Sequence, residues 1–125
     1  MSKIKIQFPR VEVTASLLDT ETSRALLAAL PCESRASTWG EEVYFALPVK
    51  AKLEPGATQV VDAGTVCFWV EGSSLALPFG PTPISEAEEC RLVTAVNILG
   101  KIEGDAQALL RVHAGDKVKV SLVAN

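Results

Sequence analysis

The chain has 125 residues, of which 48 % are hydrophobic and 22 % charged, and this length and balance predict a single globular domain over residues 1–125. The formal net charge is −3 and the twelve basic residues are scattered, which argues against nucleic-acid binding because that affinity needs clustered Lys and Arg. No stretch approaches the roughly twenty apolar residues of a membrane span, and the first eight residues alternate instead of forming a signal-peptide core. We therefore expect a cytoplasmic protein without membrane contact.

The N-terminal part predicts two strands followed by a helix. Apolar and polar residues alternate over residues 4–8 and again over 11–17, the period of half-buried strands. Thr20 and the aspartate before it offer oxygens that can cap a helix, and apolar residues follow at helical spacing over 25–30. Pro31 ends this run, so the helix should have about ten residues.

The middle of the chain predicts further strands. A polar approach leads into residues 39–47, where apolar residues alternate, and the alternation continues beyond a proline over 49–53. The run over 65–70 is too rich in aromatic and β-branched residues for a helix, and a glycine–serine turn separates it from a strand over 75–79.

The C-terminal part mixes loops, strands and a helix. Two prolines stiffen the loop at residues 80–83, and the acidic stretch 85–90 has the spacing of a capping box, which predicts a helical turn or a loop. Residues 95–102 and 117–122 predict strands, with a short helix over 105–112 between them. About eight short strands and two helices favour a closed barrel or a sandwich.

Three segments resemble a known family. Residues 95–104, AVNILGKIEG, resemble the late cyclophilin strand that ends in Phe-Gly-Lys-Val and is followed by Glu-Gly and a helix. The loop at residues 80–83, GPTP, resembles the cyclophilin Pro-Thr-Pro loop. Together with TWGEEVYF at residues 38–45, they make the chain similar to the small bacterial and archaeal cyclophilin-like proteins, a family of unknown function. The resemblance implies a mainly β fold, a closed eight-stranded barrel with two short covering helices.

The same resemblance implies that the prolyl isomerase chemistry of cyclophilins is lost. Cyclophilins hold an arginine beside the proline pocket in a Phe-His-Arg-Val strand, whereas the corresponding stretch here offers Glu41 and Glu42. Arg35 precedes that strand and is out of pattern, and Ile84 replaces the histidine that follows the Pro-Thr-Pro loop. The barrier to peptide-bond rotation is about 18–20 kcal/mol, and a pocket without the arginine has little leverage on it.

Two groups of residues are candidates for a ligand site on the face that holds the proline pocket in cyclophilins. The first group combines an aromatic ring with carboxylate and phenol groups: Trp39, Glu41, Glu42 and Tyr44. Such groups can bind a cationic or amide-bearing ligand through the ring face and hydrogen bonds. Packing of Trp39 over a barrel end, with solvated glutamates, is the alternative.

The second group is Trp69, Phe79 and Thr82, whose rings would wall a pocket that Thr82 edges. One of Phe68 and Trp69 should face the barrel interior and the other the outside, because side chains normally fill a barrel of this size. Core packing is the alternative for at least one of these rings.

Other residues carry no site. The glutamates at 86, 88 and 89 lack the pattern of a calcium loop, the single histidine, His113, excludes a His-pair metal motif, and the three cysteines have no CxxC spacing. Asn97 is expected to be a buried amide satisfied by the backbone. We assign no metal, no cofactor and no catalytic residue.

The sequence therefore predicts a binding module for a small molecule or a short peptide, without prolyl isomerase activity. The alternative is an enzyme that uses Glu41 or Glu42 as general acid or base, alone or as a subunit of a larger hydrolase. Whether the chain forms a homo-oligomer stays open.

Overall fold

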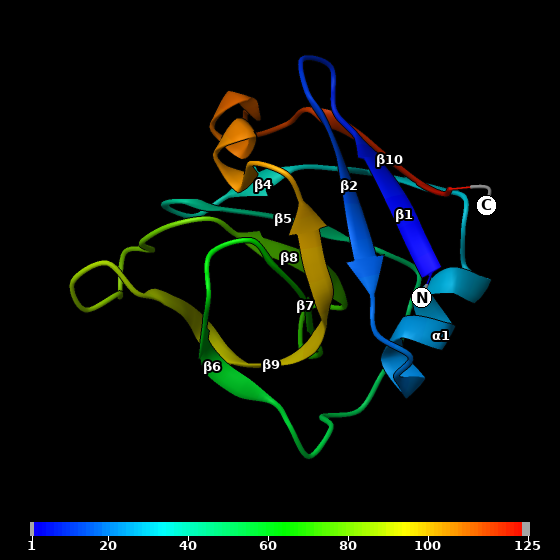
Figure 1. Ribbon diagram of the computed structural model, residues 1–125, viewed down its shortest axis with the longest axis horizontal. Helices are drawn as coiled ribbons and strands as arrows, with labels where there is room; N and C mark the ends of the chain where they lie inside the picture. The colour runs from blue at the N-terminus through cyan, green and yellow to red at the C-terminus, as the bar shows by residue number, and fades with distance from the viewer. Residues whose placement is uncertain (1, 124–125) are drawn as a thin grey trace.

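The protein is built on one antiparallel sheet of ten strands, as the computed structural model shows for residues 2–123 (Figure 1). The strand order is β3-β10-β1-β2-β9-β7-β8-β5-β4, and β6 pairs only with β9. The strands are β1 Ser2–Gln7, β2 Glu12–Leu17, β3 Cys32–Arg35, β4 Ser37–Thr38, β5 Glu42–Ala46, β6 Thr58–Val61, β7 Thr65–Trp69, β8 Ser74–Pro78, β9 Cys90–Glu103 and β10 Lys117–Leu122. The helices are α1 Glu21–Ala28 and the 3₁₀ helix η1 Ala106–Arg111.

The N-terminal hairpin follows directly from the alternating sequence. β1 and β2 pair in the register Ile4↔Ala15 and Ile6↔Val13, and these four side chains are buried in the core. The polar residues between them fall on the other face, because successive side chains of a strand point to opposite sides.

Both expected helices are present, and each has a side-chain cap. The Thr20 side chain accepts a hydrogen bond from the Ser23 amide at the start of α1, and the Asp105 side chain accepts one from the Gln107 amide at the start of η1. The second helix is a 3₁₀ helix, whose tighter turns suit so short a connection.

The expected closed eight-stranded barrel is wrong in both strand number and closure. β3 and β4 end the sheet, and only Ala36 separates them in the chain. The amide of Ala36 donates to the Asp116 carbonyl, and its carbonyl accepts from the Gly115 amide. Because this backbone bonds to the turn before β10 while β4 continues to β5, the covalent chain links the two ends of the sheet and hydrogen bonds do not close it.

Two local expectations also need correction. Residues 49–53 form no strand, because the Asn97 side chain binds the backbone of this segment and of the residue after it. Its Oδ1 accepts from the Glu54 amide at 2.8 Å, and its Nδ2 donates to the Lys52 carbonyl at 2.9 Å. The strand expected over residues 95–102 begins earlier, at Cys90, and residues 85–89 form a loop, one of the two structures expected for that stretch, in which Ser85 Oγ accepts from the amides of Thr82 and Arg91.

The sheet separates two hydrophobic clusters of different size. The main core lies on one face and includes Val43, Phe45 and Phe68. A small second cluster lies on the opposite face, where the first part of β9, paired with β6, covers β5, β8 and β7; its buried members are Cys67, Ala76, Leu92 and Val96. Figure 1 shows β9 curving beneath the sheet with β6 beside its first part. Within residues 2–123, no helix is long and apolar enough to cross a membrane.

Candidate functional site

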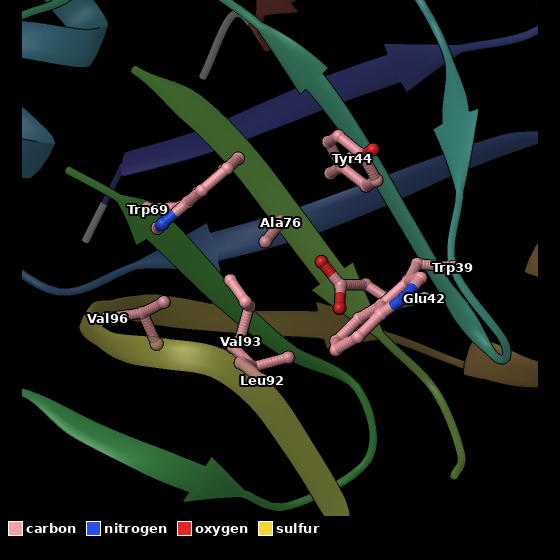
Figure 2. A pocket seen from close by; sticks show the side chains of 8 residues that line it. All are labelled: Trp39, Glu42, Tyr44, Trp69, Ala76, Leu92, Val93 and Val96. Carbon is pink, nitrogen blue, oxygen red and sulfur yellow. The ribbon is translucent and has the colours of Figure 1, made fainter. Parts of the chain in front are cut away.

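A cavity of about 230 Å³ lies in the second cluster, between the sheet and the first part of β9 (Figure 2). Its polar and aromatic walls are Trp39, Glu42, Tyr44 and Trp69. Its aliphatic walls are Ala76 from β8 and Leu92, Val93 and Val96 from β9. Four of the seven residues expected to bind a ligand therefore line one space.

The alternation of β5 directs two of these side chains to the cavity. Val43 and Phe45 enter the main core, so Glu42 and Tyr44 must point to the opposite face. Tyr44 pairs with Ala76 on β8, and a methyl group at this central position leaves room that a larger side chain would fill.

Trp39 is held by the turn that connects β4 and β5. Its amide donates to the Glu42 carbonyl at 3.0 Å, and the Glu41 amide donates to the Pro81 carbonyl at 2.9 Å. Gly40 has a φ of +60°, and a Cβ there would lie 2.9 Å from both the Pro81 oxygen and the Thr82 Cα. Only glycine permits this approach, so the loop at residues 80–83 supports Trp39 without entering the cavity.

Among the described residues, Glu42 is the one acidic residue that lines the cavity. Its side chain is 7 % exposed in the folded protein, and its Oε1 has no hydrogen-bond partner among the described residues. Burial raises the pKa of Glu42 from 4.5 to about 7, because removal from water disfavours the charged form. With a pKa of about 7, the Glu42 carboxyl is therefore present in both its protonated and its ionised form near neutral pH.

Trp69 forms the far wall and meets Tyr44 edge to face. The two ring centroids are 6.2 Å apart with an interplanar angle of 89°, a favourable geometry for aromatic pairs. The indole Nε1 is buried and has no hydrogen-bond partner within the part of the chain that the structure describes. A Cβ on Gly72 would lie 2.2 Å from the Trp69 ring, so this glycine fixes where the ring can lie.

The other three residues expected to bind a ligand do not line the cavity. Glu41 is half-buried and lies over Gly80, where a Cβ would be 2.1 Å from its Oε1. Phe79 is 4 % exposed and belongs to the main core. Thr82 is buried, and its hydroxyl bonds to Ser85 Oγ at 3.1 Å and to the Arg91 carbonyl. All three stabilise the turn and loop beneath Trp39.

The structure also answers which aromatic of β7 faces inward. Phe68 is fully buried in the main core, and Trp69 points to the opposite face and lines the cavity. The sequence did not identify Leu92, Val93 or Val96 as wall residues. The strand was expected to begin at residue 95, and the apolar pair Leu92 and Val96 at even spacing was the signal that it begins earlier.

Two buried thiols lie near the cavity and add no metal site. Burial, then the charge of Glu42, raises the pKa of Cys67, and burial followed by the charges of Asp62 and Glu41 raises that of Cys90. Among residues 2–123 there is no group of three or more His, Cys, Asp or Glu side chains that could hold a metal ion.

Comparison with known proteins places this geometry in a family. No protein of curated function matches the sequence. The solution structure of a hypothetical protein from Archaeoglobus fulgidus is 35 % identical, with a TM-score of 0.85 over 98 % of this chain and 95 % of that one. The Cyclophilin-like family model matches residues 2–121. Because that match covers nearly the whole chain, the protein belongs to the Cyclophilin-like family.

Proposed function

We propose that this protein is a binding module that takes a small molecule, or a side chain of a short peptide, in the cavity between Trp39 and Trp69. The observation that carries the proposal is the buried carboxyl of Glu42, whose Oε1 has no hydrogen-bond partner among residues 2–123, in a largely apolar space. Leaving a buried polar group unpaired costs about 1–3 kcal/mol, and a ligand that pairs with it recovers that cost. Aromatic walls add a large apolar contact area.

The test is a thermal-shift screen of metabolites and short peptides with a matched pair of variants. A ligand that binds only the native state raises its melting temperature. Ala76→Val places two methyl groups inside the cavity, whereas Ala46→Val changes an exposed residue of β5 outside it. We expect stabilising ligands to act on the wild type and on Ala46→Val but not on Ala76→Val. A ligand that stabilises all three equally would place binding elsewhere.

We also propose that the protein does not catalyse prolyl isomerisation. No arginine lines the cavity, and Arg35 is an exposed residue of β3 whose Nη1 donates to the Gly115 carbonyl at 3.1 Å. A peptide isomerisation assay should give the uncatalysed rate with both the wild type and Arg35→Ala. Acceleration by the wild type would contradict this proposal.

A second candidate function is proton transfer in the same cavity. It is favoured by the pKa of Glu42, which at about 7 suits a general acid or base near neutral pH. Compounds found in the screen can be incubated with the protein and followed by mass spectrometry. Chemical conversion by the wild type, lost in Glu42→Gln, would favour an enzyme, and recovery of unchanged compounds would favour the binding module.

We also propose that the protein works in the cytoplasm, and the cysteines support this location. Cys32, Cys67 and Cys90 are all free thiols, and two of them are buried. Unpaired thiols suit a reducing compartment. Thiol titration of the protein purified without reductant should count three free thiols per chain after unfolding, and a lower count would argue against this placement.

A further inference from the structure

The size of the cavity suits a small ligand. A volume of about 230 Å³ corresponds to roughly eight water molecules at about 30 Å³ each. A ligand with about eight to ten non-hydrogen atoms, such as one ring with a short substituent, matches this space. Figure 2 shows Glu42 and Trp39 on one side of Ala76 and Trp69 on the other, so a ligand that lies over Ala76 would have the carboxyl on one side and the indole on the other.

The ionisable groups around Glu42 are acids and carry negative charge or none. Tyr44 shares its strand, Cys67 lies on β7 and Cys90 begins β9, and none of them is a base. Glu41 and Asp62 add negative charge, because both act with Glu42 on the Cys90 thiol.

The nearest arginine along β9 is already engaged. Arg91 Nε lies 2.7 Å from a Glu89 oxygen, and its Nη2 lies 3.9 Å from Glu86. The residues that line the cavity include no lysine, arginine or histidine. Among residues 2–123, the residues that line the cavity therefore offer no positive charge to Glu42.

The aromatic walls favour the same sign of charge. Trp39, Tyr44 and Trp69 are three of the eight lining residues, and the faces of such rings attract cations within about 6 Å of the ring centroid. Their attraction strengthens where water is excluded.

Resting on the proposed binding function, we propose that the ligand class is a small organic ammonium ion whose charged head pairs with Glu42 while its apolar body packs between Trp39, Tyr44 and Trp69. An anion could accept a hydrogen bond from the Trp69 indole N–H, but it would also face the Glu42 carboxylate with no basic side chain among the lining residues. A neutral apolar ligand would leave the Glu42 carboxyl enclosed without a partner, which costs binding energy. The ammonium supplies the positive charge that no lining residue carries, together with hydrogen-bond donors for the Glu42 carboxyl.

This pairing makes affinity depend on pH in a definite direction. An ammonium ion binds the ionised carboxyl, and with a pKa of about 7 Glu42 is mostly ionised at pH 8 and about 3 % ionised at pH 5.5. The amine itself stays protonated over this range, as a lysine amine does. Affinity for the ammonium should therefore fall by about thirtyfold from pH 8 to pH 5.5, while affinity for a neutral analogue should not fall.

The experiment compares ammonium probes with alcohols of the same shape by calorimetric titration of the full chain. The pairs are benzylammonium with benzyl alcohol, phenethylammonium with 2-phenylethanol, and cyclohexylammonium with cyclohexanol. At pH 8 we expect at least one ammonium to bind about tenfold or more tightly than its alcohol, because a hydrogen bond to a charged group is the stronger kind. Glu42→Gln should remove this preference and the pH dependence together, and Ala46→Val should keep both.

The outcomes separate this inference from the proposed function. Alcohols that bind as tightly as their ammonium partners, or an ammonium preference that survives in Glu42→Gln, would overturn the ammonium class and leave the binding module intact. If no probe binds and the metabolite screen is also empty, both proposals fail. The wild-type pH profile needs no variant, so the inference stays testable even if Glu42→Gln does not fold.

One further titration distinguishes an ammonium group on a peptide side chain from one on a free small molecule. A short peptide with an internal lysine is titrated beside the free amines, together with the same peptide carrying norleucine in its place. Binding of the lysine peptide but not of the free amines assigns a peptide side chain, and the reverse assigns a free metabolite. Binding of neither kind of ammonium overturns the inference.

Discussion

Replacing Glu42 by methionine tests whether an enclosed carboxyl destabilises the fold as the pH rises. Methionine has a similar length and no ionisable group, and the surrounding walls of the cavity are mostly apolar. Glu42→Met therefore removes the charge and the unpaired oxygen together and leaves the packing nearly unchanged.

The magnitude follows from proton linkage. The unfolded chain ionises Glu42 near its ordinary pKa of 4.5, whereas the folded protein holds the proton until about pH 7. Between these values the folded state binds more protons than the unfolded state, so the wild type loses stability as the pH rises. At about 1.36 kcal/mol per pKa unit, the difference of 2.5 units amounts to about 3 kcal/mol above pH 7.

The assay is urea unfolding at pH values from 4.5 to 8.5 for the wild type and Glu42→Met. The free energy of unfolding of Glu42→Met minus that of the wild type should grow by about 3 kcal/mol across this range, most of it before pH 7. Tyr44→Phe, which changes the same cavity but keeps the carboxyl, should follow the wild-type slope. A difference between Glu42→Met and the wild type that does not vary with pH would refute the reasoning.

Three further predictions concern the elements around the cavity. Asn97→Ala should lower the free energy of unfolding by about 3 kcal/mol in urea titrations, because three side-chain hydrogen bonds to the loop after β5 and to α1 disappear; a loss below about 1 kcal/mol would contradict this role. Gly72→Ala should displace Trp69 and change the tryptophan fluorescence spectrum, whereas Gly56→Ala, with no atom within 4 Å of the added Cβ, should not; identical spectra would count against the contact. Thr20→Ala should cost about 1 kcal/mol by loss of the N-cap of α1, measured by the shift of the unfolding midpoint, and an unchanged midpoint would show that the cap is dispensable.

Short-range patterns sufficed for the elements that bury one face against the main core. The alternation over residues 4–8 and 11–17 predicted the β1–β2 hairpin, and alternation also separated Glu42 and Tyr44 from the core residues of β5. These predictions succeeded because each rests on neighbours within one strand. Alternation assigned Glu42 and Tyr44 to the cavity face, whereas Trp39 was expected as an aromatic beside the glutamates and Trp69 as one of two possible outward aromatics; these are four of the eight residues that line the cavity.

Long-range contacts decided what the sequence could not. Whether the sheet closes depends on the hydrogen bonds of the Ala36 backbone, and these go to the turn at residues 115–116, far away in the sequence. The loop over 49–53 alternates like a strand but is held by a single asparagine from β9. Phe79 and Thr82 were expected to wall and edge the ligand face, whereas both side chains are buried in the fold and the Thr82 hydroxyl bonds to the Arg91 carbonyl.

The division of the apolar residues into two clusters has a consequence for how such a protein diversifies. The cavity walls belong mainly to the small cluster under β9, while the cohesion of the sheet comes from the larger cluster on the other face. Substitutions at separate sites with no shared partners usually act independently. Positions such as Leu92, Val93 and Val96 can therefore exchange one apolar side chain for another and alter which ligand fits, with the main core untouched. Under the proposed binding function, relatives with the same sheet can differ in their ligands in this way, and directed evolution for a new ligand should begin in the first part of β9.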